Sequence, residues 1–205
     1  MNNGWNRFIY KIWAPYYDRF FNSGPFLKAR QTLFKDMKFK KGDRVLFIGV
    51  GTGADLEQIP YDELDITAID YSEEMLNQAR EKYAHTTIEF LHMDAQNLDM
   101  ENDTYDYVVA SLILTVVPDV QQAFSEMVRV AKRDGEILIF DKFVSKGKEL
   151  SLFKKIFRPI IRLLGTDIGI SFERLYLPYK DGLIMIENQD LVFKGMYRKI
   201  RLKKK

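Results

Sequence analysis

Three glycines spaced two residues apart form the first candidate ligand-binding element of this 205-residue sequence. The stretch reads VLFIGVGTGADL, and its glycines are Gly49, Gly51 and Gly53. Glycines after an apolar strand let backbone N–H groups approach a ligand, while the start of the next helix favours negative charge. The spacing also fits the dinucleotide pattern G-x-G-x-x-G/A, with Ala54 in the last position. The loop therefore predicts a site for an adenosine-containing ligand and leaves open which one.

Two acidic residues end the next two apolar runs. Asp70 ends DITAID, and Asp94 ends TIEFLHMD. A carboxylate at the tip of the second strand can accept hydrogen bonds from ribose hydroxyls, and one at the tip of the third can accept from an adenine amino group. Taken singly, Asp70 also suits a helix cap and Asp94 a surface turn. Because a glycine loop and two acids end three successive runs, we predict a nucleoside pocket.

The elements that must position these residues alternate along the chain from Val45 to Phe143. Apolar runs (RVLFIGV, DITAID, TIEFLHMD, YDYVVASLIL and GEILIF) alternate with helical patterns (ADLEQIP, SEEMLNQAREKYA and VQQAFSEMVRVAK). Such alternation predicts a parallel sheet covered by helices on both faces. Ser72, followed by two glutamates, predicts a helix N-cap. The stretch LIMIENQDLVFKGMYRKIRLK predicts two more strands, joined by a tight turn near Lys194 and Gly195.

The composition narrows the class of protein. There is no cysteine, which excludes a disulfide framework and a zinc site built on sulfur, and we nominate no metal ligands. No stretch approaches the roughly 18 uncharged apolar residues of a membrane span, and the first residues lack a signal-peptide core. We therefore expect a cytoplasmic protein of one domain.

The charge is unevenly distributed. Residues 1–44 carry ten Lys/Arg and three Asp/Glu, residues 45–141 five and twenty, and residues 142–205 sixteen and six. An acidic centre thus lies between basic ends. Within the second basic end, KELSLFKKIFRPIIRLLG resembles a basic amphipathic helix, which suits either an anionic membrane surface or a cap over a substrate pocket. We expect no nucleic-acid partner, because the basic residues accompany bulky aliphatic ones and no nucleic-acid module is recognisable.

From about residue 40 to 145 the sequence resembles the class I S-adenosylmethionine-dependent methyltransferases. The resemblance rests on five motifs in order, among them VLFIGVGTG, ITAIDYSEEMLNQAR, MDAQNLDMENDTYDYVVASLILTVVPD and AKRDGEILIFD. YYDRF, GVGTG and LLGTDIGISFERL are most similar to the phospholipid N-methyltransferase branch and its quinone-methylating relatives. The resemblance implies an α/β, Rossmann-like doubly wound sheet of seven strands. The sheet would be mostly parallel, with an antiparallel C-terminal hairpin and helices on both faces.

The resemblance also implies S-adenosylmethionine as cofactor and assigns roles to residues. The glycine loop would hold the methionine and ribose side, Asp70 the ribose and Asp94 the adenine, while Ser111 and Leu112 line the path to the methyl group. Further expected contacts are Tyr71, Met75 and Ala95 to the cofactor, and Tyr16 and Tyr17 from a segment folding over the site. Within the single domain 1–205 we expect a helical lid (1–40), a cofactor-binding core (41–145), a helical cap (146–182) and the terminal hairpin (183–205).

Two positions depart from the family pattern. Phe47 stands where the family usually has Asp or Glu, and Thr115 where many relatives have His. We nominate no catalytic base, since the two histidines, His85 and His92, fall in a loop and a strand and are expected to be structural. In-line transfer from a sulfonium depends mainly on alignment and a dry site.

The expected function is methyl transfer to a small hydrophobic or amphiphilic acceptor, such as a lipid amine or a quinone-like compound. The aromatic stripe Trp5, Phe8, Ile9, Ile12 and Trp13 suits a lid over such a molecule, or ordinary helix packing. Two alternatives stay open. One is a methyltransferase-like binding module without catalysis, for which Phe47 is the positive evidence. The other is a nicotinamide-dependent oxidoreductase, which would call for a proton donor such as a Tyr-x-x-x-Lys pair.

Overall fold

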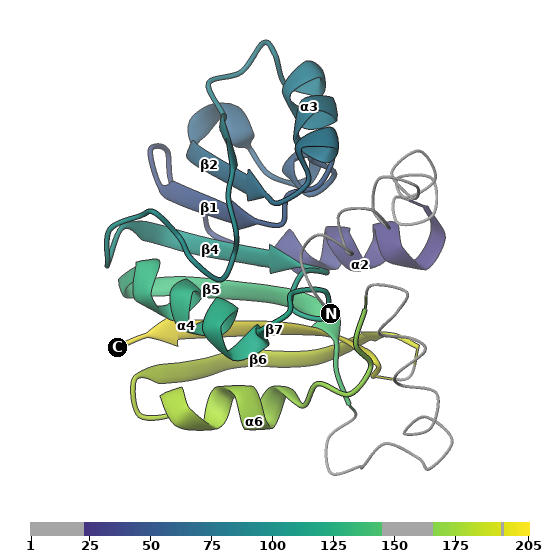
Figure 1. The fold of residues 1–205 in the computed structure, drawn as a ribbon, viewed down its shortest axis with the longest axis vertical. Coiled ribbons are helices and arrows are strands. Elements are labelled where there is room, and N and C mark those ends of the chain that lie inside the picture. Colours follow the sequence, from purple (N-terminus) through teal and green to yellow (C-terminus); the bar gives the residue numbers. More distant parts are fainter. Residues whose placement is uncertain (1–22, 145–165, 194) are drawn as a thin grey trace.

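The computed structural model describes residues 23–144, 166–193 and 195–205, whose seven strands form one mixed sheet (Figure 1). The strand order is β3-β2-β1-β4-β5-β7-β6. The first five strands are parallel, and β7 runs antiparallel to both β5 and β6. The strands are β1 (Arg44–Ile48), β2 (Asp65–Asp70), β3 (Glu89–His92), β4 (Tyr105–Ser111), β5 (Ala131–Lys142), β6 (Leu183–Val192) and β7 (Tyr197–Lys204). The predicted fold class, including the antiparallel hairpin, is confirmed.

Four α-helices cover the sheet in the described ranges: α2 (Gly24–Phe34), α3 (Glu73–Lys82), α4 (Val120–Val130) and α6 (Phe172–Tyr176). Three of them begin at a side-chain cap. Ser72 accepts a hydrogen bond from the N–H of Met75, as the sequence predicts, and Asp119 and Ser171 cap α4 and α6 in the same way.

The stretch ADLEQIP differs from its prediction as a helix, because it forms only a short 3-10 helix, η1 (Leu56–Gln58). Pro60 disfavours the α conformation in the residue before it, and Ile59 is accordingly extended, with φ −131° and ψ 159°. A second 3-10 helix, η2 (Tyr61–Glu63), leads into β2, and a third, η3 (Leu177–Tyr179), follows α6. The crossover from β1 to β2 is therefore made of short turns, and the segment after the glycine loop stays close to the sheet.

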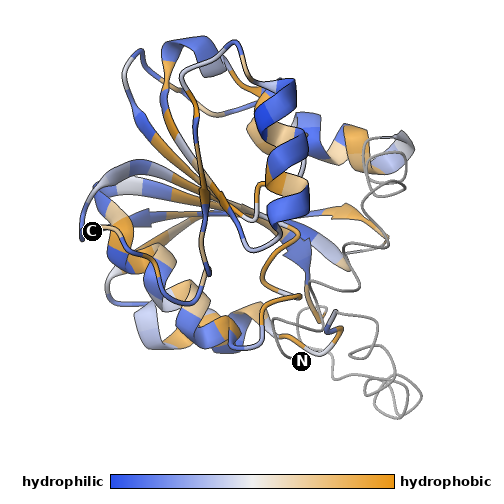
Figure 2. Cartoon of the chain, turned by 45° about the horizontal axis from the view of Figure 1, so that its top comes forward, coloured by the Kyte–Doolittle hydropathy of each residue, from blue (hydrophilic) through white to orange (hydrophobic). Residues whose placement is uncertain are grey.

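Alternate residues of the central strands face two hydrophobic clusters, one on each side of the sheet. Leu46 and Ile48 of β1 belong to the cluster that includes residues of α4 and α6, whereas Val45 and Phe47 belong to the cluster on the side of α2 and α3. Figure 2 shows hydrophobic residues along the strands and hydrophilic residues on the outer side of α3. This burial of both faces is typical of parallel sheets and explains the nearly continuous apolar runs.

The cations of β7 are paired with acids, and two of them, Arg198 and Lys199, are fully buried. Lys199, with no exposed side-chain surface, contacts Glu187 of β6 at 3.0 Å and donates to the carbonyl of Thr32 in α2 at 3.1 Å. The other pairs are Arg198 with Glu173, Arg201 with Glu136, Lys203 with Asp134 and Lys204 with Asp103. Three of these acids, Asp103, Asp134 and Glu136, lie in the acidic central part of the sequence, residues 45–141. Part of the basic C-terminal charge therefore compensates acids of the same chain.

Several predictions concern residues outside the described ranges. They are the aromatic stripe Trp5–Trp13, the lid residues Tyr16 and Tyr17, and the basic stretch around Lys154, Lys155, Arg158 and Arg162. Of the expected cap, 166–182 is described and contains α6 and η3. Among the helices of the described ranges, none has the length and apolar character needed to cross a bilayer.

Candidate functional site

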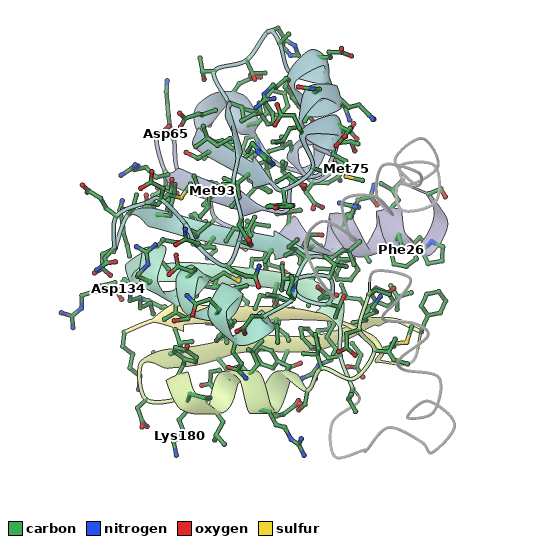
Figure 3. The ribbon with its side chains drawn as sticks, viewed as in Figure 1. Phe26, Asp65, Met75, Met93, Asp134 and Lys180 are labelled. Atoms are coloured by element: carbon green, nitrogen blue, oxygen red, sulfur yellow. The ribbon has the colours of Figure 1, made fainter. Side chains whose placement is uncertain are left out.

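A cavity lies at the carboxyl ends of β1 to β4, where the sequence places its predicted ligand-binding residues. Its wall is formed by the segments that follow these strands, by Arg30 of α2 and by Met75 in the first turn of α3. Figure 3 shows Met75 at the end of α3 beside the carboxyl ends of β1 and β2. Nine of the ten predicted cofactor contacts line this cavity: Gly49, Gly51, Asp70, Tyr71, Met75, Asp94, Ala95, Ser111 and Leu112.

Gly49 and Gly53 of the loop have different structural roles. Gly49 adopts φ +72°, and a Cβ on it would lie 2.8 Å from the side chain of Ile113, so only glycine allows this close approach. Gly53, the tenth predicted residue, does not line the cavity. A Cβ there would lie 2.6 Å from the ring of Tyr83, whose hydroxyl donates to the Gly53 carbonyl at 2.8 Å. Gly53 therefore serves packing beneath the loop.

Asp70 is held by two backbone donors. One carboxylate oxygen accepts from the N–H of Gly51 at 2.9 Å and the other from the N–H of Ser72 at 2.8 Å. Burial raises the pKa of Asp70, and the two hydrogen bonds oppose that shift. A carboxylate has about four acceptor positions, so two bonds fix its orientation and leave capacity for ligand hydroxyls.

Asp94 and His92 lie near the end of β3. The carboxylate of Asp94 accepts from the backbone N–H of Gln96 at 2.9 Å, and the side-chain oxygen Oε1 of Gln96 accepts from the N–H of Asp119 at 2.8 Å. This chain of bonds ties the tip of β3 to the start of α4. His92 does not line the cavity; its Nε2 lies 3.0 Å from the carbonyl oxygen of Tyr71.

The tip of β4 combines an unpartnered hydroxyl with backbone strain. Ser111 Oγ is buried and has no hydrogen-bond partner among the described residues. Leu112 adopts φ +58°, a left-handed conformation that costs about 1–2 kcal/mol for a residue with a side chain. Its N–H donates to the carbonyl of Phe140 at 2.7 Å, which holds it there. Strain and an unsatisfied buried group at one point of a cavity wall indicate a functional position.

Part of the cavity wall is formed by residues that the sequence did not predict to be there. Arg30 and Asp55 form an ion pair and are each 5% exposed. Asp55 directly follows the glycine loop, which is a local signal, but no sequence pattern brings α2 beside that loop. The apolar part of the wall that was missed includes Val50, Met93, Ile113, Val116 and Val117.

Comparison with known proteins identifies the family. Residues 46–139 match the family described as Methyltransferase domain. Over 139 residues the chain is 36% identical to phosphatidylethanolamine N-methyltransferase of Cereibacter sphaeroides, an alignment that covers 66% of this chain and 68% of that protein. The chain belongs to the class I S-adenosylmethionine-dependent methyltransferases.

Further similarities extend over more of this methyltransferase. It is 28% identical over 200 residues to the demethylmenaquinone methyltransferase of Listeria monocytogenes, covering 93% of this chain and 81% of the relative. The crystal structure of an S-adenosylmethionine-dependent methyltransferase from Thermotoga maritima matches with a TM-score of 0.69 at 18% identity, over 96% of this chain and 99% of that one. The last match establishes the fold alone. The predicted enzyme class is confirmed by the family assignment.

Phe47, the methyltransferase's departure from the usual acid, points away from the cavity. It is 2% exposed, it is absent from the cavity wall, and its ring centroid lies 6.3 Å from that of Phe34 in α2. The substitution therefore affects how β1 packs against α2. Phe47 was the positive evidence for a non-catalytic binding module. Its position outside the cavity wall removes that evidence.

Proposed function

We propose that this methyltransferase binds S-adenosylmethionine in the cavity at the strand tips and transfers its methyl group to an amphiphilic amine. Gly49 and Gly51 give the ligand access to the backbone, Asp70 accepts from the ribose hydroxyls, and Asp94 accepts from the adenine amino group. Tyr71, Met75 and Ala95 supply apolar contacts around the nucleoside. The observation that carries the proposal is the convergence of the glycine loop, both acids and the strained tip of β4 on one cavity.

The donors and acceptors of the wall fit this cofactor. Asp70 and Asp94 are acceptors facing the part of the cavity formed by β2 and β3, as a ribose and an adenine amino group require. A Cβ on Gly51 would meet only the Met75 sulfur, at 3.6 Å, so its absence leaves space beside the loop. Ser111 offers a hydroxyl that has no other partner in the described residues.

When bound, S-adenosylmethionine supplies an electrophilic methyl group on a sulfonium. The residues of this chain provide alignment and a dry wall for the transfer. Ser111 and Leu112 lie at the tip of β4, and the apolar side chains of Ile113, Val116 and Val117 continue the wall from there. Leu112 is held in its left-handed conformation by the carbonyl of Phe140, so the tip is preorganised.

Two facts support an amine as acceptor. The relative at 36% identity is named as a phosphatidylethanolamine N-methyltransferase. The ionisable side chains of the described cavity wall are Arg30, Asp55, Asp70, Tyr71 and Asp94, without a histidine or lysine. An amine that binds in its neutral form needs no strong base, whereas a phenolic acceptor does.

A quinone-like acceptor is the second candidate, because the relative named as a demethylmenaquinone methyltransferase aligns over 93% of this chain. For either acceptor we propose that the enzyme meets its substrate at an anionic membrane surface, as a peripheral protein. The sequence of the basic stretch around Lys154 supports this part of the proposal.

Cofactor binding is tested by thermal denaturation and calorimetry with S-adenosylmethionine, S-adenosylhomocysteine, NAD and NADP. At 100 times its dissociation constant a ligand adds about 2.7 kcal/mol of stability, which raises the melting temperature by several degrees. We expect a rise with the first two ligands alone. A rise with NAD or NADP would support the oxidoreductase instead, and no response to any ligand would support the binding module.

The acceptor is tested by transfer of a labelled methyl group to vesicles that contain phosphatidylethanolamine or demethylmenaquinone. Each is offered in a neutral lipid background and in one with anionic lipid. We expect methylated amine as the product, at a higher rate with anionic lipid. Methylation of the quinone alone would shift the assignment to the second candidate. Rates that are independent of anionic lipid would contradict the membrane-surface part.

A further inference from the structure

The ion pair between Arg30 and Asp55 is part of the cavity wall. The guanidinium Nη1 of Arg30 contacts the carboxylate Oδ1 of Asp55, and both residues line the cavity together with Gly49, Gly51 and Thr52. Arg30 comes from the middle of α2, and Asp55 from the turn between the glycine loop and η1. One positive and one negative group thus lie side by side next to the glycine loop.

The presence of a buried ion pair is not explained by a gain in folding stability. Removing two charges from water often costs as much as their attraction returns, and apolar replacements of similar size are frequently as stable. Here the side chains are only 6% and 7% exposed, and the neighbouring α2 residues Leu33 and Phe34 already bind the helix to the sheet through apolar contacts. The position of the pair in a ligand cavity supplies such a reason.

The chemistry of the pair complements one part of the proposed ligand. The tail of S-adenosylmethionine is an α-amino acid, with a carboxylate and an ammonium group bonded to the same carbon. An arginine can donate two parallel hydrogen bonds to a carboxylate, and an aspartate accepts from an ammonium group. In the proposed binding mode Asp70 and Asp94, which line the cavity at the tips of β2 and β3, contact the nucleoside, so the tail needs partners elsewhere on the wall.

We propose that Arg30 and Asp55 form the subsite for the zwitterionic tail of the cofactor, an inference that rests on the proposed binding of S-adenosylmethionine in this cavity. Arg30 binds the carboxylate, and Asp55 binds the ammonium group. The pair then fixes the amino-acid end of the ligand while the acids of β2 and β3 fix its nucleoside end. The reactive sulfonium between these ends is thereby oriented by side chains from both sides.

Three ligands that differ only in the tail and the sulfonium separate these contacts in calorimetry. S-adenosylmethionine carries both charged groups, decarboxylated S-adenosylmethionine lacks the carboxylate, and 5′-methylthioadenosine lacks the whole tail. Arg30→Met is expected to weaken binding of the first ligand roughly 10- to 100-fold and to change the other two less than about threefold. Asp55→Asn is expected to weaken the first two ligands and to leave the third unchanged.

A double variant, Arg30→Met with Asp55→Leu, guards against loss of folding, because it leaves no unpaired buried charge. It is expected to bind S-adenosylmethionine hardly better than 5′-methylthioadenosine. Arg80→Met is the matched control, since Arg80 pairs with Glu73 at 2.6 Å on α3 and does not line the cavity. It should leave all three affinities unchanged.

The results distinguish the subsite from the function itself. If the variants weaken 5′-methylthioadenosine as much as S-adenosylmethionine, the pair only holds α2 against the loop and the inference is wrong. If the double variant still prefers S-adenosylmethionine as strongly as the unaltered protein does, the inference is also wrong. If the unaltered protein binds none of the three ligands, the proposed cofactor site fails, whatever the variants do.

Discussion

The hydroxyl of Thr115 donates a hydrogen bond of 2.7 Å to the carboxylate of Asp141, which has no exposed surface. The N–H of Thr115 donates to the same carboxylate at 3.2 Å, and its carbonyl accepts from the N–H of Asp167 at 2.7 Å. One threonine thus joins the segment after β4, the end of β5 and the segment before α6. Thr115 lies between the cavity-wall residues Ile113 and Val116, so these hydrogen bonds fix the segment that carries both of them.

Thr115→Val should destabilise the protein, because the isosteric side chain leaves the buried carboxylate without its hydroxyl donor. We expect a loss of about 1–3 kcal/mol in the free energy of unfolding, measured by urea denaturation. Thr115→Ser keeps the hydroxyl and should lose less than half as much. Equal losses in both variants would show that the methyl group matters and the hydrogen bond does not.

The stability of the protein should depend on the pH through Asp141. Burial raises the pKa of Asp141 above its ordinary value of 3.8, so the folded state keeps this proton to a higher pH than the unfolded state does. The resulting stability is fully present below pH 3.8 and is lost as the pH rises through the folded-state pKa. Asp141→Asn carries no such proton and should gain stability relative to the unaltered protein over the pH window that begins at 3.8 and ends at the folded-state pKa.

The measurement compares urea midpoints of the two proteins at several values of pH in that window. Asp70, whose pKa is also raised by burial, is present in both proteins, and its contribution cancels in the difference. Parallel curves would mean that Asp141 has the same proton affinity in both states.

Gly49→Ala should impair both stability and cofactor binding. The left-handed φ of +72° costs alanine about 1–2 kcal/mol, and the new Cβ meets Ile113 at 2.8 Å. Adding Ile113→Gly, which removes the Cβ, Cγ1 and Cδ1 atoms that the new Cβ meets, should relieve the clash and leave the conformational cost. Urea denaturation of the single and double variants, with calorimetry of S-adenosylhomocysteine binding, separates the two contributions. A fully stable single variant would show that the loop can shift without cost.

Phe47→Asp, which restores the acid usual in the family, should destabilise this chain by at least about 3 kcal/mol. The carboxylate would replace a 2%-exposed ring in contact with α2, so the cost of burying a charge adds to that of lost packing. Phe47→Leu should cost less than about 1.5 kcal/mol and leave S-adenosylhomocysteine affinity within about threefold. A large loss of affinity in the leucine variant, with stability retained, would assign Phe47 a role at the ligand.

Local patterns in the sequence were sufficient to predict the strands, and together with the family resemblance they predicted nine of the residues that line the cavity. The glycine loop, Asp70 and Asp94 could be found because each ends an apolar run, and parallel strands bring such ends to one edge of the sheet. The seven-stranded, mostly parallel sheet and its antiparallel hairpin followed from the family resemblance together with the hydrophobic alternation.

The remaining features depend on contacts between distant segments. Arg30 lines the cavity only because Leu33 and Phe34 of the same helix pack on the sheet beside β1, which no periodicity in α2 reveals. Gly53 fits the motif, yet its neighbour is the ring of Tyr83, thirty residues away. The burial of Lys199 could not be predicted either, since its partners Glu187 and Thr32 come from a neighbouring strand and a helix near the other end of the chain.

The position of β7 between β5 and β6 has a consequence for the order in which the sheet can form. β6 precedes β7 in the chain but pairs with β7 alone, so β6 cannot join the sheet before β7 does. The hairpin can form locally through its short turn, whereas pairing of β7 with β5 closes a loop of more than fifty residues and is intrinsically slower. We therefore expect β6 and β7 to dock on β5 as one unit late in folding, when Arg201 also reaches Glu136 of β5.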